Sequence, residues 1–175
     1  MISLDQLNKI IPYAGHRAGV FLVPLNEAME EFGILTPNRE AAFVAQIAHE
    51  SCSLHCMCEL ASGSGYEGRV DLGNTEQGDG VRYKGRGLIQ ITGRANYASC
   101  SAVLYGDPET LQAHPEILEG TVAACRSAAW WWQAHGLNEL ADACEFTRIT
   151  KRINGGLNGQ PERLAFYTTA LQELV

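Results

Sequence analysis

The sequence predicts a mainly α-helical domain that carries one long glycine-rich insertion. Apolar residues recur at helical spacing over most of the 175 residues, and capping residues precede several of these apolar series. Nine glycines interrupt the pattern between residues 61 and 94, far more than a helix accepts. Hydrophobic residues make up 46% of the chain, which is enough to form a core. The length of the chain fits a single domain over residues 1–175.

Two helices are expected near the N-terminus. Ser3 and Gln6 form a capping-box pattern ahead of an apolar series that ends near Ile11. A second helix is expected from about Arg17 to Phe32, where Pro24 should kink the helix or begin a new turn.

The later helices are marked by proline and glycine. Thr36-Pro37 is typical of a helix start, and a third helix is expected over Ala41 to about Leu54. Further helices are expected after Asp107-Pro108, from Gly120 to His135, and from Pro161 to the end.

The glycine-rich stretch from Ala61 to Arg94 is expected to be an ordered loop or a small sheet. Only Leu88–Thr92 resembles a strand. A loop of this length inside a compact domain is more often functional than filler.

The composition excludes several classes of function. Thirteen Lys and Arg against twenty Asp and Glu give a net charge of −7, with no basic stripe to bind a phosphate backbone, so nucleic acid is not an expected partner. Apolar stretches fall short of the roughly 20 residues that a membrane span requires. The first residues lack the features of a secretory signal, so we expect a cytosolic origin with the six cysteines reduced.

Glu50 stands out in the third helix. At 100° per residue it shares one stripe with Phe43, Ile47 and Leu54, which should face the core. A carboxyl group placed there loses part of its hydration, which raises its pKa and suits a general acid. Alternatively, Glu50 ends the stripe at the edge of the protein and pairs with an arginine.

Glu59 is the next acidic residue, nine positions later. In one unbroken helix the two side chains would lie on opposite faces, so a shared substrate requires the helix to end near Leu54 and the chain to reverse. From spacing alone, four neighbouring acids are equal candidates: Glu67, Asp71, Glu76 and Asp79.

Four stretches between about residues 40 and 165 carry a family resemblance. They are Ala48-His49-Glu50-Ser51, then Glu59, then the run from Gly78 to Tyr97 with its Tyr-Lys-Gly-Arg-Gly-Leu-Ile-Gln-Ile-Thr-Gly-Arg core, and Ile153-Asn154-Gly155-Gly156. In this order they resemble the family-19 glycoside hydrolases, most of all the lysozyme-type members used as bacteriophage endolysins.

The resemblance implies a lysozyme-like α+β fold with a small β element and an active-site cleft between helical lobes. It implies hydrolysis with inversion, in which Glu50 is the general acid, Glu59 the base that activates water, and Thr92 helps to hold that water. The substrate-binding positions it implies are His49, Tyr83, Gln90, Asn96, Asn154 and Arg163. An inverting enzyme needs its two carboxyl groups about 6.5 to 9.5 Å apart. No cofactor or metal is implied.

Three departures from the family pattern favour peptidoglycan over chitin. Cys52-Ser53-Leu54 follows Glu50 where many members have glycines, Ala95 stands where chitinases commonly carry tyrosine, and the loops before Asp79 are short. The expected function is therefore a monomeric muramidase that cleaves the β-1,4 bond between N-acetylmuramic acid and N-acetylglucosamine in peptidoglycan strands. A holin-type partner would release it from the host cytoplasm to the periplasm, and a separate wall-binding domain is not expected.

Three other hypotheses for the function remain open. The first is a chitinase acting on β-1,4-linked N-acetylglucosamine. The second is a metal site among His49, Cys52, His55, Cys56 and Cys58, although their spacing matches no common zinc pattern. The third is a glycan-binding module without turnover, which would have little need for both carboxylates.

Overall fold

The computed structural model describes all 175 residues, and almost all of its regular structure is helical. In chain order the α-helices are α1 (Leu4–Ile10), α2 (Arg17–Glu31), α3 (Pro37–Glu50), α4 (Asp79–Arg82), α5 (Arg94–Tyr105), α6 (Thr110–Ala113), α7 (Thr121–Ala134), α8 (Leu137–Asp142), α9 (Phe146–Asn154) and α10 (Gln160–Leu174). The expected mainly helical fold class is confirmed.

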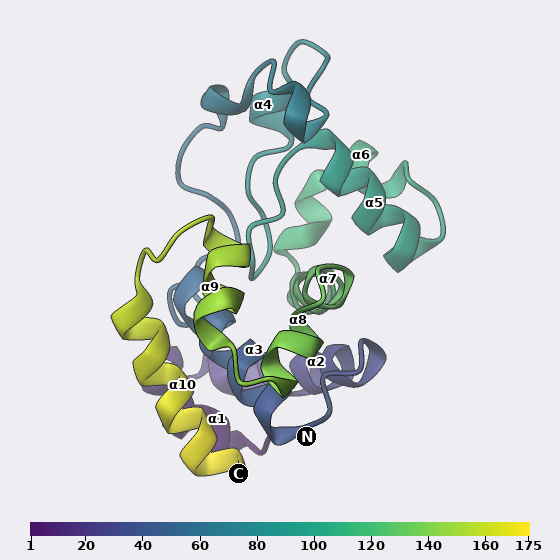
Figure 1. Cartoon of the computed structure of the whole chain (residues 1–175). Helices are drawn as coiled ribbons and strands as arrows, with labels where there is room; N and C mark the ends of the chain where they lie inside the picture. Colours follow the sequence, from purple (N-terminus) through teal and green to yellow (C-terminus); the bar gives the residue numbers. More distant parts are fainter.

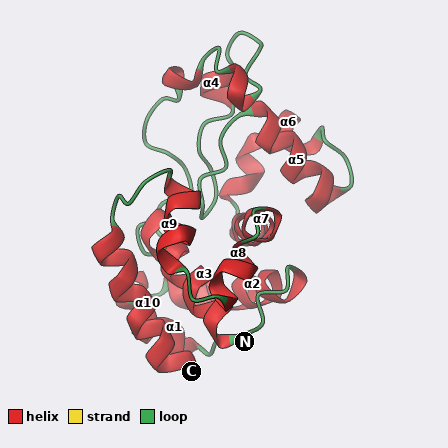
Figure 2. Ribbon diagram, viewed as in Figure 1, coloured by secondary structure: helices red, strands yellow, loops and turns green.

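The helices form two groups, which long loops connect (Figure 1, Figure 2). The lower group contains α1, α2, α3, α8, α9 and α10, and the upper group contains α4, α5 and α6, with α7 between them. None of the helices combines the length and the apolar character needed to cross a membrane.

The N-terminal helices begin as the capping residues predict. The hydroxyl of Ser3 accepts the backbone N–H of Gln6 at 3.2 Å, and the Gln6 side chain accepts the N–H of Ser3 at 2.9 Å. The second helix, α2, runs through Pro24 without ending there. The third, α3, begins at Pro37, where Thr36 caps the N–H of Arg39 at 3.3 Å.

Helix α3 lies at the centre of the lower group. Every residue from Glu40 to Ala48 is buried, so protein surrounds this helix on all sides rather than along one stripe. Helix α10 packs along it, and Phe43 meets Trp132 of α7 edge-on, with ring centroids 5.3 Å apart. The helix ends at Glu50, four residues before the expected Leu54.

The expected strand over Leu88–Thr92 is wrong. Arg86 and Ile91 exchange two backbone hydrogen bonds, of 3.1 and 2.8 Å, so the four residues between them form a tight turn. Gln90 has φ +59°, which no strand accommodates. The small β element reduces to two isolated bridges, Cys58 with Arg86 and Arg86 with Ile91.

Helices α5, α8 and α9 were not expected from the sequence. The buried residues of α5 include Tyr97, Cys100, Ser101 and Leu104, which follow helical spacing. A serine occupies one of these positions because its hydroxyl accepts the N–H of Leu111 at 3.0 Å. Because Ser101 is polar, the apolar face of α5 is incomplete in the sequence and did not predict a helix.

Candidate active site

Glu50 is the last residue of α3, and its side chain is 17% exposed. Its Oε1 accepts a hydrogen bond of 2.5 Å from Nη2 of Arg163, a residue of α10 whose side chain is fully buried. The structure therefore brings together the residue expected to be the acid and the arginine that the resemblance implies. Oε2 of Glu50 makes no hydrogen bond within the chain, which leaves it free for a substrate.

The chain turns sharply after Glu50. Cys52, Ser53 and Leu54 all adopt positive φ, between 50° and 68°, although none is glycine. Each such residue costs about 1 kcal/mol or more. The Ser51 hydroxyl offsets part of this cost by donating to the carbonyl of Ile47 at 2.5 Å and accepting the N–H of Leu54 at 2.9 Å. This left-handed turn ends α3 and sends the chain toward Glu59.

Glu59 is held by two residues of the glycine-rich stretch, Gly85 and Tyr66. Its backbone N–H donates to the carbonyl of Gly85 at 2.9 Å, and its Oε2 accepts the N–H of Gly85 at 3.0 Å. Its Oε1 accepts the hydroxyl of Tyr66 at 3.1 Å. Burial, and then the Glu59 carboxylate, raise the pKa of Tyr66, so this phenol remains a donor. Neither Tyr66 nor Gly85 was identified from the sequence.

Gln90, Thr92 and Asn96 form a short hydrogen-bonded series, of which Gln90 lies close to Glu59. Asn96 donates to the carbonyl of Thr92 at 2.7 Å, and the Thr92 hydroxyl donates to the carbonyl of Gln90 at 2.9 Å. A methyl group on Gly85 would lie 2.7 Å from Oε1 of Gln90 and 3.2 Å from Oε2 of Glu59. Both side chains therefore converge on this glycine, and the Thr92 oxygen keeps lone pairs that can accept a water proton.

His49 is the penultimate residue of α3, and Asn154 is the last residue of α9, just before the loop that leads to α10. His49 Nδ1 makes a short contact with the carboxylate of Glu162, and Gly159 lies directly on the imidazole ring. Oδ1 of Asn154 is buried and has no hydrogen-bond partner. A buried acceptor in this state costs about 1–3 kcal/mol, which a donor on a bound substrate would recover.

Tyr83 lies in the upper helical group, where it lines the cavity described below. The residue is 2% exposed, packs against Tyr97, and donates its hydroxyl to the carbonyl of Gln112 at 3.3 Å. No contact in the chain joins Tyr83 to Glu50 or Glu59, so its expected contact with substrate stays a prediction.

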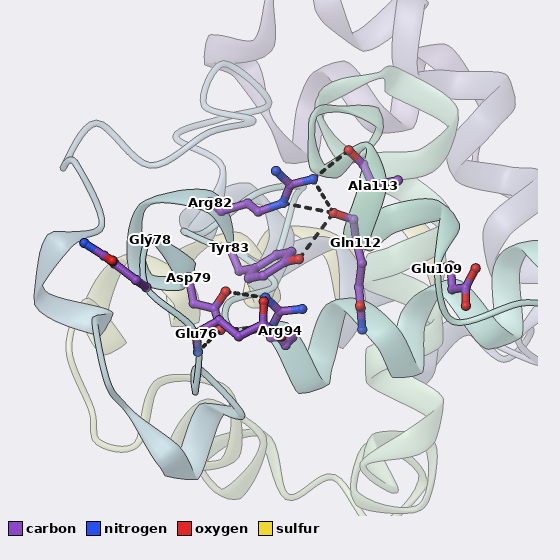
Figure 3. A pocket seen from close by; sticks show the side chains of 10 residues that line it. Glu76, Gly78, Asp79, Arg82, Tyr83, Arg94, Glu109, Gln112 and Ala113 are labelled. Atoms are coloured by element: carbon purple, nitrogen blue, oxygen red, sulfur yellow. Dashed lines mark hydrogen bonds and ion pairs between the residues drawn. The ribbon is translucent and has the colours of Figure 1, made fainter.

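The largest cavity, about 630 Å³, lies in the upper group and is lined by neither Glu50 nor Glu59 (Figure 3). Three of its charged residues are paired: Arg94 donates to both oxygens of Asp79, at 2.6 and 2.9 Å, and also to Glu76. Arg82, which also lines the cavity, donates to the backbone carbonyls of Gln112 and Ala113. The Arg94 guanidinium holds the pKa of Asp79 below its usual range. This cavity is a polar feature of the lobe rather than the site of the two carboxylates.

The neighbouring Cys56 thiol raises the pKa of Cys52, so two of the cysteines lie side by side. All six thiols are free, and no three His, Cys, Asp or Glu side chains lie together in an arrangement that could hold a metal ion. Burial raises the pKa of Cys100 to about 12, as expected for a small core residue.

No family model matches the chain, but comparisons with individual proteins find relatives. A Haemophilus influenzae protein described as glycosyl hydrolase family 19 domain-containing is 32% identical over 95% of this chain and 94% of its own length. Endochitinase CHI of Arabidopsis thaliana is 33% identical over 75% of this chain, which spans half of that enzyme. The fold matches that of chitinase C from Streptomyces griseus with a TM-score of 0.80, over 99% and 92% of the two chains, at 23% identity.

These relatives define a glycoside hydrolase of mainly helical fold. The chain belongs to glycosyl hydrolase family 19.

Proposed function

We propose that this glycosidase cleaves the β-1,4 bond between N-acetylmuramic acid and N-acetylglucosamine in peptidoglycan, with inversion at the anomeric carbon. The observation that carries the mechanism is the contrast between the two carboxylates. Glu50 contacts a buried guanidinium through one oxygen, whereas Glu59 is held by a backbone N–H and a phenol. Glu59 therefore has a partner on each oxygen, whereas Glu50 keeps one oxygen without a partner in the chain, which is where a glycosidic oxygen could bind.

In this mechanism Glu50 carries its proton on Oε2 and delivers it to the glycosidic oxygen as the bond to the anomeric carbon breaks. Arg163 stabilises the carboxylate that Glu50 becomes. Glu59 removes a proton from the water that attacks the opposite face of the sugar, and Thr92 orients this water. The product is a hemiacetal of inverted configuration, and both carboxyl groups return to their starting state by exchanging protons with solvent.

The preference for peptidoglycan is supported by the small side chain next to Asn96. Ala95 lies in the first turn of α5 and is exposed, so this position presents a methyl group and no aromatic ring. A small side chain leaves room for the lactyl and peptide substituents of muramic acid. Chitin remains the second candidate, because several named relatives are endochitinases.

Mass spectrometry of digests decides between the two substrates. Purified sacculi and chitohexaose are incubated with the enzyme, reduced with borohydride and separated. Reduced muramic acid at new chain ends supports the proposal, reduced glucosamine ends from sacculi indicate a glucosaminidase, and turnover of chitohexaose alone indicates a chitinase. Proton NMR during early turnover identifies the first anomer formed, and a β-anomer would contradict inversion.

Variants test the roles of the carboxylates. We expect Glu50→Gln and Glu59→Gln each to lower kcat by roughly 10²-fold or more, because each removes one proton-transfer step. Glu76→Gln is the matched control, since Glu76 lies in the same loop region, pairs with Arg94 and is largely exposed. Wild-type turnover by Glu59→Gln would show that another acid is the base.

We further propose a cellular role as a monomeric endolysin that is made in the host cytoplasm and released to the periplasm by a holin-type partner. Support comes from the resemblance to phage lysozymes and from the proposed substrate. Expression of the chain alone should leave cells intact, and co-expression with a pore-forming holin should cause lysis. Lysis without any permeabilising partner would contradict this role.

A further inference from the structure

Arg163 is a fully buried cation with few partners. Its Nη2 donates to Oε1 of Glu50, its Nη1 donates to Oε1 of Gln46, both at 2.5 Å, and its Nε donates to the carbonyl of Asn158 at 3.1 Å. A buried guanidinium is tolerated only where it is paired and hydrogen-bonded. Glu50 is its single ion-pair partner, so the remaining contacts decide how the guanidinium is oriented.

Gln46 is also fully buried and lies one turn before Glu50 on α3. Because a guanidinium can only donate, Gln46 must direct its carbonyl oxygen to Arg163 and its NH₂ group elsewhere. That NH₂ group donates to Oγ1 of Thr150 on α9 at 2.8 Å. The Thr150 hydroxyl in turn donates to the carbonyl of Phe146 at 3.4 Å. Each donor along this series therefore points in a fixed direction.

We propose that Gln46 and Thr150 are positioning residues that hold the Arg163 guanidinium against Glu50. The two terminal nitrogens of Arg163 bind two side chains one helical turn apart, so the contact with Gln46 fixes the rotation of the guanidinium plane. Without that contact Nη1 would be unsatisfied, and Nη2 would no longer be held on the carboxylate. This inference rests on the proposed role of Glu50 as the acid.

The competing explanation is that this buried series only stabilises the junction of α3, α9 and α10. The two explanations differ in which property of Thr150 matters. Positioning requires its hydroxyl oxygen, which accepts from Gln46, whereas packing requires its volume in a site that is fully buried. Valine keeps the volume and loses the hydroxyl, and serine keeps the hydroxyl and loses the methyl group.

The kinetic test compares Thr150→Val with Thr150→Ser on the glycan that the wild type cleaves. Positioning predicts that Thr150→Val lowers kcat about tenfold with KM little changed, because misplacement of a catalytic group acts mainly on turnover. Thr150→Ser should keep kcat within about twofold of wild type. Gln46→Met, which keeps length and loses both hydrogen bonds, should resemble Thr150→Val. Asn138→Leu is the matched control, because Asn138 is another buried amide with two hydrogen bonds, to Trp132 and Phe32.

A second readout does not depend on activity. In the wild type the Nη protons of Arg163 should exchange slowly with solvent and give resolved NMR signals, and these signals should persist in Thr150→Ser and weaken in Thr150→Val. The inference is overturned if Thr150→Val keeps wild-type kcat, or if serine is the more damaging change. If Glu50→Gln is active, or if the wild type cleaves no glycan, the proposed function is wrong, and this result does not decide the positioning role. Identical Arg163 signals in the valine and serine variants would then overturn the positioning role.

Discussion

Gly85 is the position where one methyl group should most directly disturb the proposed base. Its N–H binds Oε2 of Glu59 at 3.0 Å, and its carbonyl accepts the N–H of the same residue. In Gly85→Ala the new Cβ would lie 2.7 Å from Oε1 of Gln90, 3.3 Å from its Cβ and 3.2 Å from the Glu59 carboxylate. Because ordinary contacts begin near 3.4 Å, both side chains must move by several tenths of an ångström.

The expected cost follows from that displacement. Overpacking of this kind typically destabilises a protein by about 1–3 kcal/mol, which in a chain of this size lowers Tm by roughly 2–12 °C. A shift of the base approaching 1 Å would lower kcat by up to about 10²-fold. We therefore expect Gly85→Ala to remain folded at 25 °C while its kcat falls at least tenfold.

The assay measures glycan turnover and thermal unfolding on the same preparations. Gly65→Ala is the matched control, because a Cβ on Gly65, in the same glycine-rich segment, meets nothing within 4 Å. Its kcat and Tm should stay close to those of the wild type. Wild-type kcat in a folded Gly85→Ala enzyme would refute the assignment of Glu59 as the base, or the geometry that holds it.

Two further predictions concern other parts of the molecule. Gly159→Ala would place a Cβ 2.1 Å from Cε1 of His49, so it should displace the imidazole ring and lower kcat. Gly155→Ala is the control, because Gly155 has a similar positive φ but no neighbour within 4 Å, and this variant therefore reports the backbone cost alone. Equal kcat values for the two variants would argue against a role for His49. Arg94→Met should lower the free energy of unfolding more at pH 7 than at pH 3, because the Arg94 guanidinium depresses the pKa of Asp79 in the folded state. This stabilisation is present above the unfolded pKa of about 3.9 and is lost as the pH falls through the folded value. Chemical denaturation at both pH values checks this second prediction, and an equal loss at both would contradict it.

Features governed by local sequence could be predicted. The Ser3–Gln6 capping box and the start of α3 at Pro37 each depend on residues within one helical turn. The position of Glu50 on α3 also follows from local periodicity, although the arginine that pairs with it lies 113 positions later. The spacing left two alternatives open for Glu50, a catalytic role and a pairing with an arginine, and the structure shows the pairing with Arg163.

Features governed by long-range pairing could not be predicted from local sequence. Glu59 is held in place by Gly85, 26 residues later, whose N–H donates to its carboxylate, and spacing along the chain does not reveal this contact. Tyr66, which also holds that carboxylate, follows no local pattern that would identify it. The Leu88–Thr92 segment has the composition of a strand, but the pairing of Arg86 with Ile91 closes it into a turn. Here a tertiary contact overrides β-propensity.

The left-handed turn after Glu50 explains how two residues nine positions apart can belong to one site. If α3 continued past Glu50, the two carboxylates would lie on opposite faces of a helix. Glycine would make the turn at less conformational strain, but it would also lose more entropy on folding. The chain instead uses Cys52, Ser53 and Leu54, and it secures the turn by burying Leu54 completely and by a hydrogen bond from Arg17 of α2 to the Leu54 carbonyl. Tertiary contacts thus hold the strained backbone, and the direction in which the chain leaves α3 toward Glu59 depends on the core of the lower helical group.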